Sequence, residues 1–281
     1  MKTRVISGIV GIIIAIFAVM IFYNTIFDIV AFAVYAIAVF EIYRVFKKGN
    51  SVFSTVVLMI LGGAVILYSY MPFDIMPIAV AFVVSVVCVV VFEFEKIEFV
   101  SIASTIAFAL YVLFGIYNVL RLRVIMPYNE YGYDAVFMFT ICAGIAWGGD
   151  IMAYFTGYLL GKHKMAPKLS PKKTIEGAIG GIVGSIVITL IVTIVYSHMS
   201  IAAASSVVDI SRHYPALIIF AGIGSFVGII GDLFASAVKR QHGIKDYGNI
   251  MPGHGGILDR FDSFLLVAPV VSLLADFVVK I

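Results

Sequence analysis

The chain has 281 residues, of which 62% are hydrophobic and 12% are charged, and its mean hydropathy is +1.11. A soluble domain carries about a quarter charged residues, so this composition excludes an ordinary soluble enzyme and indicates an integral membrane protein. The formal net charge of +3 does not indicate a nucleic-acid partner, and none is expected. The two cysteines, Cys88 and Cys142, lie far apart in apolar runs and predict neither a disulfide framework nor a metal motif.

Segments of roughly 20 apolar residues can cross a bilayer as helices. The first is interpreted as a span and not as a signal peptide, because its apolar run is long and no small-residue cleavage site closes it. The expected spans are residues 5–23, 26–43, 52–70, 75–92, 97–119, 135–160, 175–196, 216–238 and 263–279. We therefore expect an all-α, polytopic protein with about nine transmembrane helices. Residues 1–134 would hold five of them, and residues 135–281 would form a catalytic part with charged loops.

Lysine and arginine are concentrated on one side of this predicted arrangement. If the N-terminus lies in the cytoplasm, most of the 19 Lys and Arg residues fall in cytoplasmic segments, as the positive-inside rule requires. Two richly charged loops, residues 161–174 and 239–262, then face the cytoplasm, where nucleotides are found. We expect a multi-pass protein of the cell (inner or plasma) membrane with a cytoplasmic N-terminus and an active site on the cytoplasmic face.

Glycines recur at helical spacing in the last third of the chain, over residues 177–184 and 224–231. Small residues on one helix face let membrane helices approach closely, so helix packing is the favoured interpretation.

Asp150 lies within the sixth span and shares a helical face with Trp147, Tyr154 and Gly157. A carboxylate there needs a metal, a cation or a hydroxyl as a partner. Ligand binding and an interhelical hydrogen bond remain equal alternatives for Asp150.

The loop that follows contains two prolines and five lysines. Either Ser170 or Thr174 can cap the next helix, and Glu176 would then lie in its first turn, where the helix dipole favours an anion. The SPKKT unit at this helix N-terminus suggests phosphate contact through Lys172 and Lys173. Ordinary positive-inside topology would account for two or three of the five lysines.

The most informative stretch is residues 236–262, where four basic side chains, two histidines, three aspartates and five glycines fall within 27 residues. Charge beside a bilayer is expensive and marks a functional site by default. Just upstream, Asp232 shares a helical face with Ser236 and Lys239. Asp232 and Asp259 could jointly hold a hard divalent cation such as Mg²⁺. A structural salt-bridge network is the alternative, but it accounts less well for so many charges at one membrane face.

The polar residues of this stretch form the pattern Ser236-x-x-Lys239-Arg240-x-x-x-x-Lys245-Asp246, then His254-Gly255-Gly256-x-x-Asp259-Arg260-x-Asp262. The pattern resembles the signature of phosphatidate cytidylyltransferases, also called CDP-diacylglycerol synthases. Two further segments match the same family: Trp147-x-x-Asp150-x-x-Ala153-Tyr154-x-x-Gly157 and Ser170-Pro171-Lys172-Lys173-Thr174-x-Glu176-Gly177. The motif resemblance covers about residues 147–263, and says little about the five N-terminal spans.

The resemblance implies an enzyme that joins CTP to phosphatidic acid, giving CDP-diacylglycerol and pyrophosphate in phospholipid biosynthesis. It also implies a helical bilayer protein, a homodimer, dependence on Mg²⁺, and a second, monovalent cation such as K⁺ as a further candidate. The catalytic candidates are Lys239, Arg240, Lys245, Asp246, His254 and Arg260. The substrate-binding candidates are Asp150, Tyr154, Ser170, Lys172, Lys173, Thr174, Ser236, Gly255 and Gly256. The metal candidates are Asp232, Asp259 and Asp262.

Two other functions fit parts of the sequence. A transporter of an anionic metabolite would suit many spans with intramembrane aspartates and glycine-broken helices, but the charges cluster at one face, not at the midplane. A CTP-dependent polyprenol or phytol kinase would transfer the γ-phosphate to an alcohol and would need a base for that hydroxyl. The long signature favours the cytidylyltransferase over both.

His254 is the apparent general base of the signature, but the chemistry does not require one. A phosphomonoester has a second pKa near about 6, so its attacking oxygen is mostly ionised at neutral pH. We expect His254→Gln to retain measurable activity in an assay of purified protein. Complete loss of activity, with fold and metal binding intact, would contradict this expectation.

Overall fold

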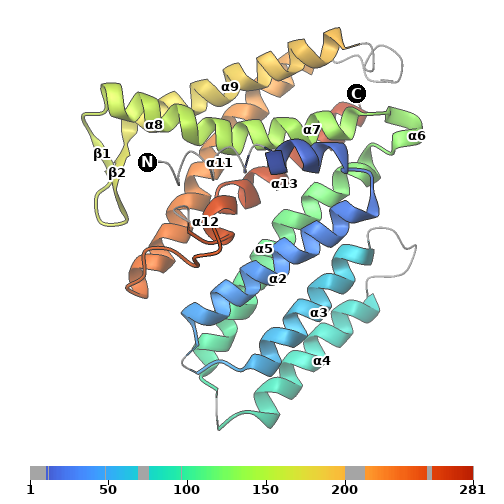
Figure 1. Ribbon diagram of the computed structural model, residues 1–281, viewed down its shortest axis with the longest axis vertical. Helices are drawn as coiled ribbons and strands as arrows, with labels where there is room; N and C mark the ends of the chain where they lie inside the picture. The colour runs from blue at the N-terminus through green and yellow to red at the C-terminus, as the bar shows by residue number, and fades with distance from the viewer. Residues whose placement is uncertain are drawn as a thin grey trace. The chain divides into compact units, whose positions relative to one another are not determined.

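The computed structural model describes residues 11–280 apart from 12, 48, 69–75, 96, 200–212 and 252–254. Helices joined by short loops make up most of this part of the chain (Figure 1). The helices are α2 (Thr25–Val45), α3 (Val52–Tyr68), α4 (Met76–Phe92), α5 (Phe99–Ile125), α6 (Tyr128–Tyr131), α7 (Asp134–Ala143), the π-helical turn η1 (Gly144–Gly148), α8 (Gly149–Leu160), α9 (Ile175–His198), α11 (Tyr214–Gln241), α12 (Leu258–Phe261) and α13 (Phe264–Lys280).

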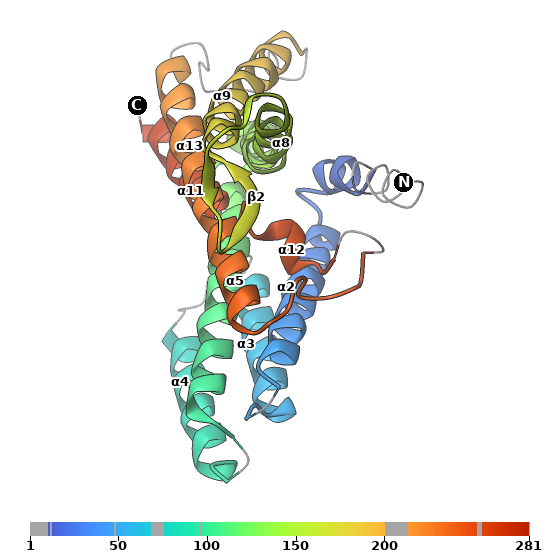
Figure 2. The same ribbon diagram turned by 90° about the vertical axis from the view of Figure 1, so that its left-hand side faces the viewer.

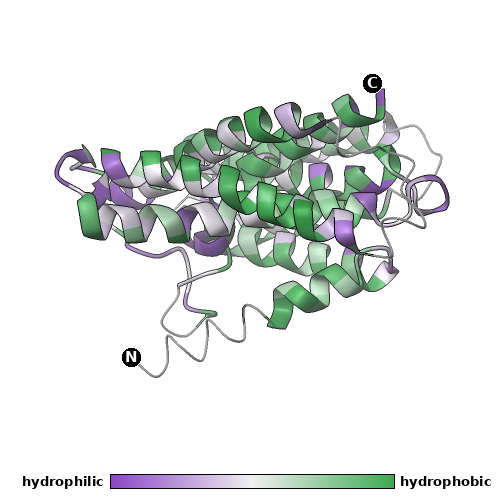
Figure 3. Ribbon diagram, turned by 90° about the horizontal axis from the view of Figure 1, so that it is seen from above, coloured by the Kyte–Doolittle hydropathy of each residue, from purple (hydrophilic) through white to green (hydrophobic). Residues whose placement is uncertain are grey.

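Within the described residues, five helical segments are long and apolar enough to cross a membrane: α2, α5, the continuous run of α7, η1 and α8, then α9, and α11. Residues 52–67 and 80–92 form shorter apolar helices. Figure 3 shows that the helices are mainly hydrophobic, with hydrophilic residues gathered at their ends and in the loops. The chain is therefore a multi-pass membrane protein. Residues 5–10 and 12 of the first expected span, 5–23, lie outside the described residues, and residues 13–20 of it are helical.

The charged loop after α8 contains regular structure. It folds into an antiparallel hairpin of β1 (Lys164–Ala166) and β2 (Ser170–Thr174), with Lys164 opposite Thr174 and Ala166 opposite Ser170. Thr174 ends β2 and caps α9, since its Oγ1 accepts the N–H of Gly177 at 3.1 Å. Of the two predicted capping residues, Thr174 is confirmed. The prolines do exclude helix here, but they leave enough backbone donors to pair two short strands.

The chain forms two compact units, and the first contains residues 1–120 and 246–260. Figures 1 and 2 show α2, α3, α4 and α5 lying side by side in this unit. The Tyr35 hydroxyl of α2 donates to the Leu58 carbonyl of α3 at 3.0 Å, and the Asn50 amide donates to Thr105 Oγ1 of α5 at 2.6 Å. These bonds satisfy polar groups that would otherwise be exposed to an apolar environment.

The second unit contains residues 121–245 and 261–281. Here α8 and α9 run alongside each other, as Figure 1 shows, and their glycines permit the close contact. A Cβ atom on Gly177 would lie 2.8 Å from the Ala153 carbonyl oxygen, and one on Gly181 would lie 3.0 Å from the Ala153 Cβ. The packing role expected for these glycines is confirmed. Arg121 and Asp276 form an ion pair at 2.7 Å within the same unit.

Gly231 of α11 provides a test of this packing. A Cβ atom there would lie 2.6 Å from the backbone oxygen of Asp262, which cannot rotate away. We expect Gly231→Ala to lower the free energy of unfolding by about 1–3 kcal/mol, because overpacking forces the backbone to shift. Thermal unfolding in detergent would measure the change. Gly222→Ala is the matched control, since its nearest neighbour, Ile186, lies 3.8 Å away. Equal stability of the two variants would contradict the prediction.

Candidate active site

The π-helical turn η1 and α8 place two motif residues against the start of α13. The Trp147 ring stacks on Phe264, with ring centroids 5.3 Å apart, and meets Phe261 edge-on at 5.8 Å. Asp150 Oδ2 accepts a hydrogen bond from the Ser263 hydroxyl at 3.1 Å. Of the two alternatives for Asp150, the structure therefore contains the interhelical hydrogen bond. Single π-helical turns are frequent at functional sites.

Asp262 is a buried carboxyl group with a raised pKa. It is 8% exposed, and one of its oxygens accepts the N–H of Ser263 at 2.9 Å. Burial raises the pKa of Asp262 to about 7, the negative charges of Asp232 and Asp150 add to this rise, and Lys239 opposes it. Asp262, which lies just before α13, is therefore within electrostatic reach of two other carboxylates, Asp232 of α11 and Asp150 of α8.

Asp232 links these aspartates to the β1–β2 hairpin through a contact with β2. It forms an ion pair with Lys173 of β2, and the Ser236 hydroxyl donates to Asp232 Oδ1 at 3.3 Å. Lys239, seven residues and about two turns along α11 from Asp232, is buried. Two motif segments separated by some 60 residues, 170–177 and 232–239, thus meet at one carboxylate in the second unit.

Arg240 ties the hairpin to the end of α11 by backbone contacts. Its Nε donates to the Leu169 carbonyl at 3.3 Å, and its Nη1 donates to the Ile244 carbonyl at 3.0 Å. Lys172 and Lys245 are both exposed. Exposed lysines keep mobile ammonium groups that can reach a phosphate, whereas Arg240 is partly committed to holding the loop.

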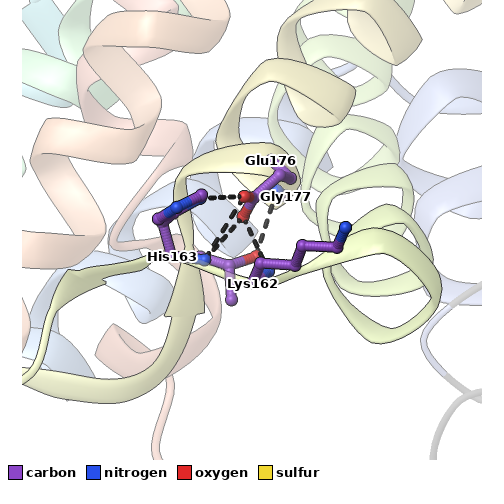
Figure 4. Close-up of polar contacts among 5 residues, drawn as sticks. Lys162, His163, Glu176 and Gly177 are labelled. Carbon is purple, nitrogen blue, oxygen red and sulfur yellow. Dashed lines mark hydrogen bonds and ion pairs between the residues drawn. The ribbon is translucent and has the colours of Figure 1, made fainter.

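Glu176, in the first turn of α9, closes the base of the hairpin (Figure 4). Its carboxylate accepts the backbone N–H groups of Lys162 and His163 at 3.1–3.3 Å, and the His163 ring Nδ1 lies 2.6 Å from Glu176 Oε1. The His163 carbonyl in turn accepts the N–H of Ile175 at 2.9 Å. These contacts fix where the SPKKT strand leaves α9.

The glycine-rich part of the signature belongs to the first unit. Asp259 is 8% exposed, and its Oδ2 accepts the N–H groups of Tyr247 at 2.8 Å and Gly256 at 2.9 Å. Gly255 has a φ of +83°, a conformation that L side chains rarely adopt, which explains the glycine. Asp259 therefore shapes the loop that it terminates, in addition to any contact with a cation.

Sequence reasoning missed one residue of this loop's surroundings. Glu41 of α2 is 1% exposed, and it accepts the backbone N–H groups of Ile257 at 3.0 Å and Leu258 at 2.9 Å. The available signal was a carboxylate near the end of an otherwise apolar span, which is by default a functional residue. It was overlooked because its partners are backbone groups more than 200 positions away.

The remaining site candidates differ in their exposure and position. Tyr154 is exposed and stacks on Tyr158 with centroids 6.4 Å apart, and does not share the contacts of Asp150. Asp246 and Arg260 are exposed, and Ser170 lies half-buried in β2. His254 lies outside the described residues.

Comparison with known proteins identifies the family. The model of the cytidylyltransferase family matches residues 2–278. The phosphatidate cytidylyltransferase of Bacillus subtilis is 33% identical over 285 residues, covering 98% of this chain and 97% of the relative. The chain belongs to the phosphatidate cytidylyltransferase family. Shorter matches to phosphatidate cytidylyltransferases include Pseudomonas aeruginosa, 42% identical over 130 residues (46% of this chain, 44% of the relative), and Haemophilus influenzae, 30% identical over 161 residues (57% and 53%).

A divalent cation fits the aspartates that surround Asp262 in this cytidylyltransferase. Within the described residues, no three His, Cys, Asp or Glu side chains form a group able to hold a metal ion on their own. Mg²⁺ does not need such a cage, because it usually takes one or two protein carboxylates and completes its shell with substrate phosphates and water. Asp262 and Asp232 supply hard oxygen donors, and a cation beside them would stabilise the ionised form of Asp262, whose pKa is raised by burial and by the nearby aspartates.

The Glu176 contacts predict how the hairpin is held. Glu176→Ala removes the acceptor for the Lys162 and His163 amides, so the hairpin should open more often. We expect the initial rate of tryptic cleavage at Lys162, Lys164 and Lys168 to rise severalfold. Glu130→Ala, at an exposed acidic position, is the control. Cleavage at the same rate in both variants would show that Glu176 does not hold the hairpin.

Proposed function

We propose that this chain transfers the cytidylyl group of CTP to phosphatidate, giving CDP-diacylglycerol and pyrophosphate. Family membership over nearly the full length supports this reaction. The observation that carries the proposal is the meeting of Lys173, Asp232 and Asp262 within one folded unit. This arrangement combines fixed anions, suited to a cation, with lysines suited to phosphate.

The chemistry is a displacement between two anions. An oxygen of the phosphatidate phosphate attacks the α-phosphorus of CTP, and the bond from that phosphorus to the departing pyrophosphate breaks. Repulsion between the reactants must be reduced before they can align, so positioning and charge neutralisation carry most of the catalysis. Lysine and arginine side chains supply that neutralisation through charge-assisted hydrogen bonds. We assign it to Lys172, Lys173, Lys239, Arg240, Lys245 and Arg260.

Three aspartates are proposed as ligands of Mg²⁺: Asp232, Asp259 and Asp262. When bound, the ion supplies Lewis-acid stabilisation of charge on the CTP phosphates and the leaving pyrophosphate. Asp232 has Lys173 as its present partner, so binding of a cation would release that lysine toward the substrate phosphates. A second, monovalent cation such as K⁺ remains part of the proposal through family resemblance. Asp150, held by Ser263, would add negative charge beside the ion.

The other signature residues are assigned to substrate contact. His254 would donate a hydrogen bond to a phosphate, and Asp246 would orient a neighbouring cation. The backbone at Gly255 and Gly256 would approach the nucleotide closely. We place Tyr154, Ser170, Thr174 and Ser236 among the residues that shape the substrate pocket. For Thr174 and Ser236 this role is indirect, since each already makes a hydrogen bond within the protein.

The bilayer location follows from the two substrates. The acyl chains of phosphatidate remain in the leaflet, whereas CTP arrives from water, so the site must lie where both can reach it. We propose that the chain spans the membrane about nine times, with its N-terminus in the cytoplasm and its active site on that face. This orientation rests on the distribution of Lys and Arg. A homodimer is proposed from family resemblance alone.

Position-specific labelling of CTP tests the reaction. Purified protein in detergent would receive Mg²⁺, phosphatidate, and CTP labelled at either the α- or the γ-phosphate. We expect α label in the lipid and γ label in released pyrophosphate, with both signals lost in excess EDTA and restored by added Mg²⁺. Lipid carrying the γ label would mean a kinase. No transfer from either position, by protein shown to be folded, would favour a transporter.

A further inference from the structure

Glu41 makes an unusual pair of contacts for a side chain of an apolar helix. Its two carboxylate oxygens accept different backbone N–H groups, Ile257 N–H on Oε1 at 3.0 Å and Leu258 N–H on Oε2 at 2.9 Å. The side chain is only 1% exposed. A buried carboxylate is costly unless it is fully hydrogen-bonded, so these two bonds are what make it tolerable there.

The loop is built to reach this carboxylate. A Cβ atom on Gly248 or on Gly256 would lie 2.3 Å from Glu41 Oε1, so both arms of the loop pass against Glu41 with bare backbone. Only glycine permits so close an approach. The contact therefore involves both described parts of the loop, at residue 248 and at residues 256–258.

A second carboxylate completes the arrangement from within the loop. Asp259 Oδ2 accepts the N–H groups of Tyr247 and Gly256, while Glu41 takes those of Ile257 and Leu258. Two buried acids thus bind four amides of one segment. In the described residues of the loop, 246–251 and 255–260, the regular structure is an isolated pairing of Met251 with Gly255 and the start of the short helix α12. The four amide contacts to Glu41 and Asp259 therefore hold both described parts of the loop.

We propose that Glu41 is a positioning residue for cytidylyl transfer, an inference that rests on the function proposed above. Its carboxylate fixes the loop 246–260 and thereby sets the position of Asp259 and of the Gly255–Gly256 backbone. Both contacts described for Glu41 go to backbone amides, so it acts through the loop and not on the substrate. Through this side chain α2, which carries no motif residue, would contribute to the active site.

Each carboxylate oxygen of Glu41 accepts one backbone N–H group, so substitutions that remove one or both acceptors test the contact. Glutamine keeps one acceptor but turns an NH₂ group toward an N–H donor, so one amide loses its partner. Alanine removes both acceptors. Glu130→Gln is the matched control, because Glu130 is an exposed glutamate outside the proposed machinery.

Amide hydrogen exchange, measured by mass spectrometry, tests the hydrogen bonds between Glu41 and the amides of Ile257 and Leu258. In Glu41→Gln and Glu41→Ala, we expect exchange in a peptide covering residues 247–258 to accelerate by about 10-fold or more, as loss of a charge-assisted bond implies. Peptides from α9 and α11 should exchange as in the unmodified protein. Unchanged exchange over 247–258 in both variants would overturn the proposal.

Gly248→Ala tests the same contact from the loop side with Glu41 kept. The added methyl group collides with the Glu41 carboxylate, so exchange over 247–258 should again accelerate, while Gly222→Ala should have no effect. In the double variant Glu41→Ala/Gly248→Ala that collision is gone, so the effect should be smaller than the product of the single effects. Strictly multiplicative effects would count against a direct contact. If Glu41→Ala does not fold, Glu41→Gln and Gly248→Ala still decide the question.

Kinetics separate positioning from simple support of the fold. For Glu41→Gln, we expect kcat for CDP-diacylglycerol formation to fall about 10- to 100-fold, with the KM for phosphatidate changed less than about threefold, because misplacement affects alignment in the transition state. Wild-type kcat per folded molecule would overturn the proposal. If the unmodified protein makes no CDP-diacylglycerol, the proposed function fails, whereas the exchange data still establish whether Glu41 fixes the loop.

Discussion

Pairing of carboxylates in a largely apolar chain is the constraint on which the rest of this structure depends. A carboxylate that is removed from water must find a cation, a hydroxyl or backbone amides. The buried Glu41 accepts the amides of Ile257 and Leu258, the half-buried Asp232 pairs with Lys173, and the exposed Asp150 accepts the Ser263 hydroxyl. Each pairing joins segments that are distant in the sequence, so charge compensation also assembles the motif residues.

Close helix packing makes those pairings possible. Gly177 and Gly181 let α9 lie against α8, and this fixes the start of α9 and the β2 strand that leads into it. This packing places Lys173 where it forms an ion pair with Asp232 of α11. A single methyl group at these contacts would therefore move the strand that carries Lys172 and Lys173.

Much of the fold could be predicted because hydropathy and capping act locally. The ranges 26–43, 97–119, 135–160, 175–196 and 216–238 correspond closely to long helices, and Thr174 caps α9 as expected. The β1–β2 hairpin and the π-helical turn at Gly144–Gly148 could not be predicted, because both depend on contacts with neighbouring helices. Glu41 illustrates the same limit, since no local pattern links a glutamate in α2 to amides near the other end of the chain.

By itself, the sequence determined that the protein lies in a membrane, where its helices run, and which family its signature resembles, because composition and motif spacing are properties of the chain alone. Only the tertiary structure decided which charged groups meet. It brought Asp150, Asp232 and Asp262 within electrostatic reach, assigned Lys173 to Asp232, and placed the loop 246–260 on Glu41. The physical reason is that pairing of charged side chains depends on distance in space, which helix packing sets and sequence separation does not.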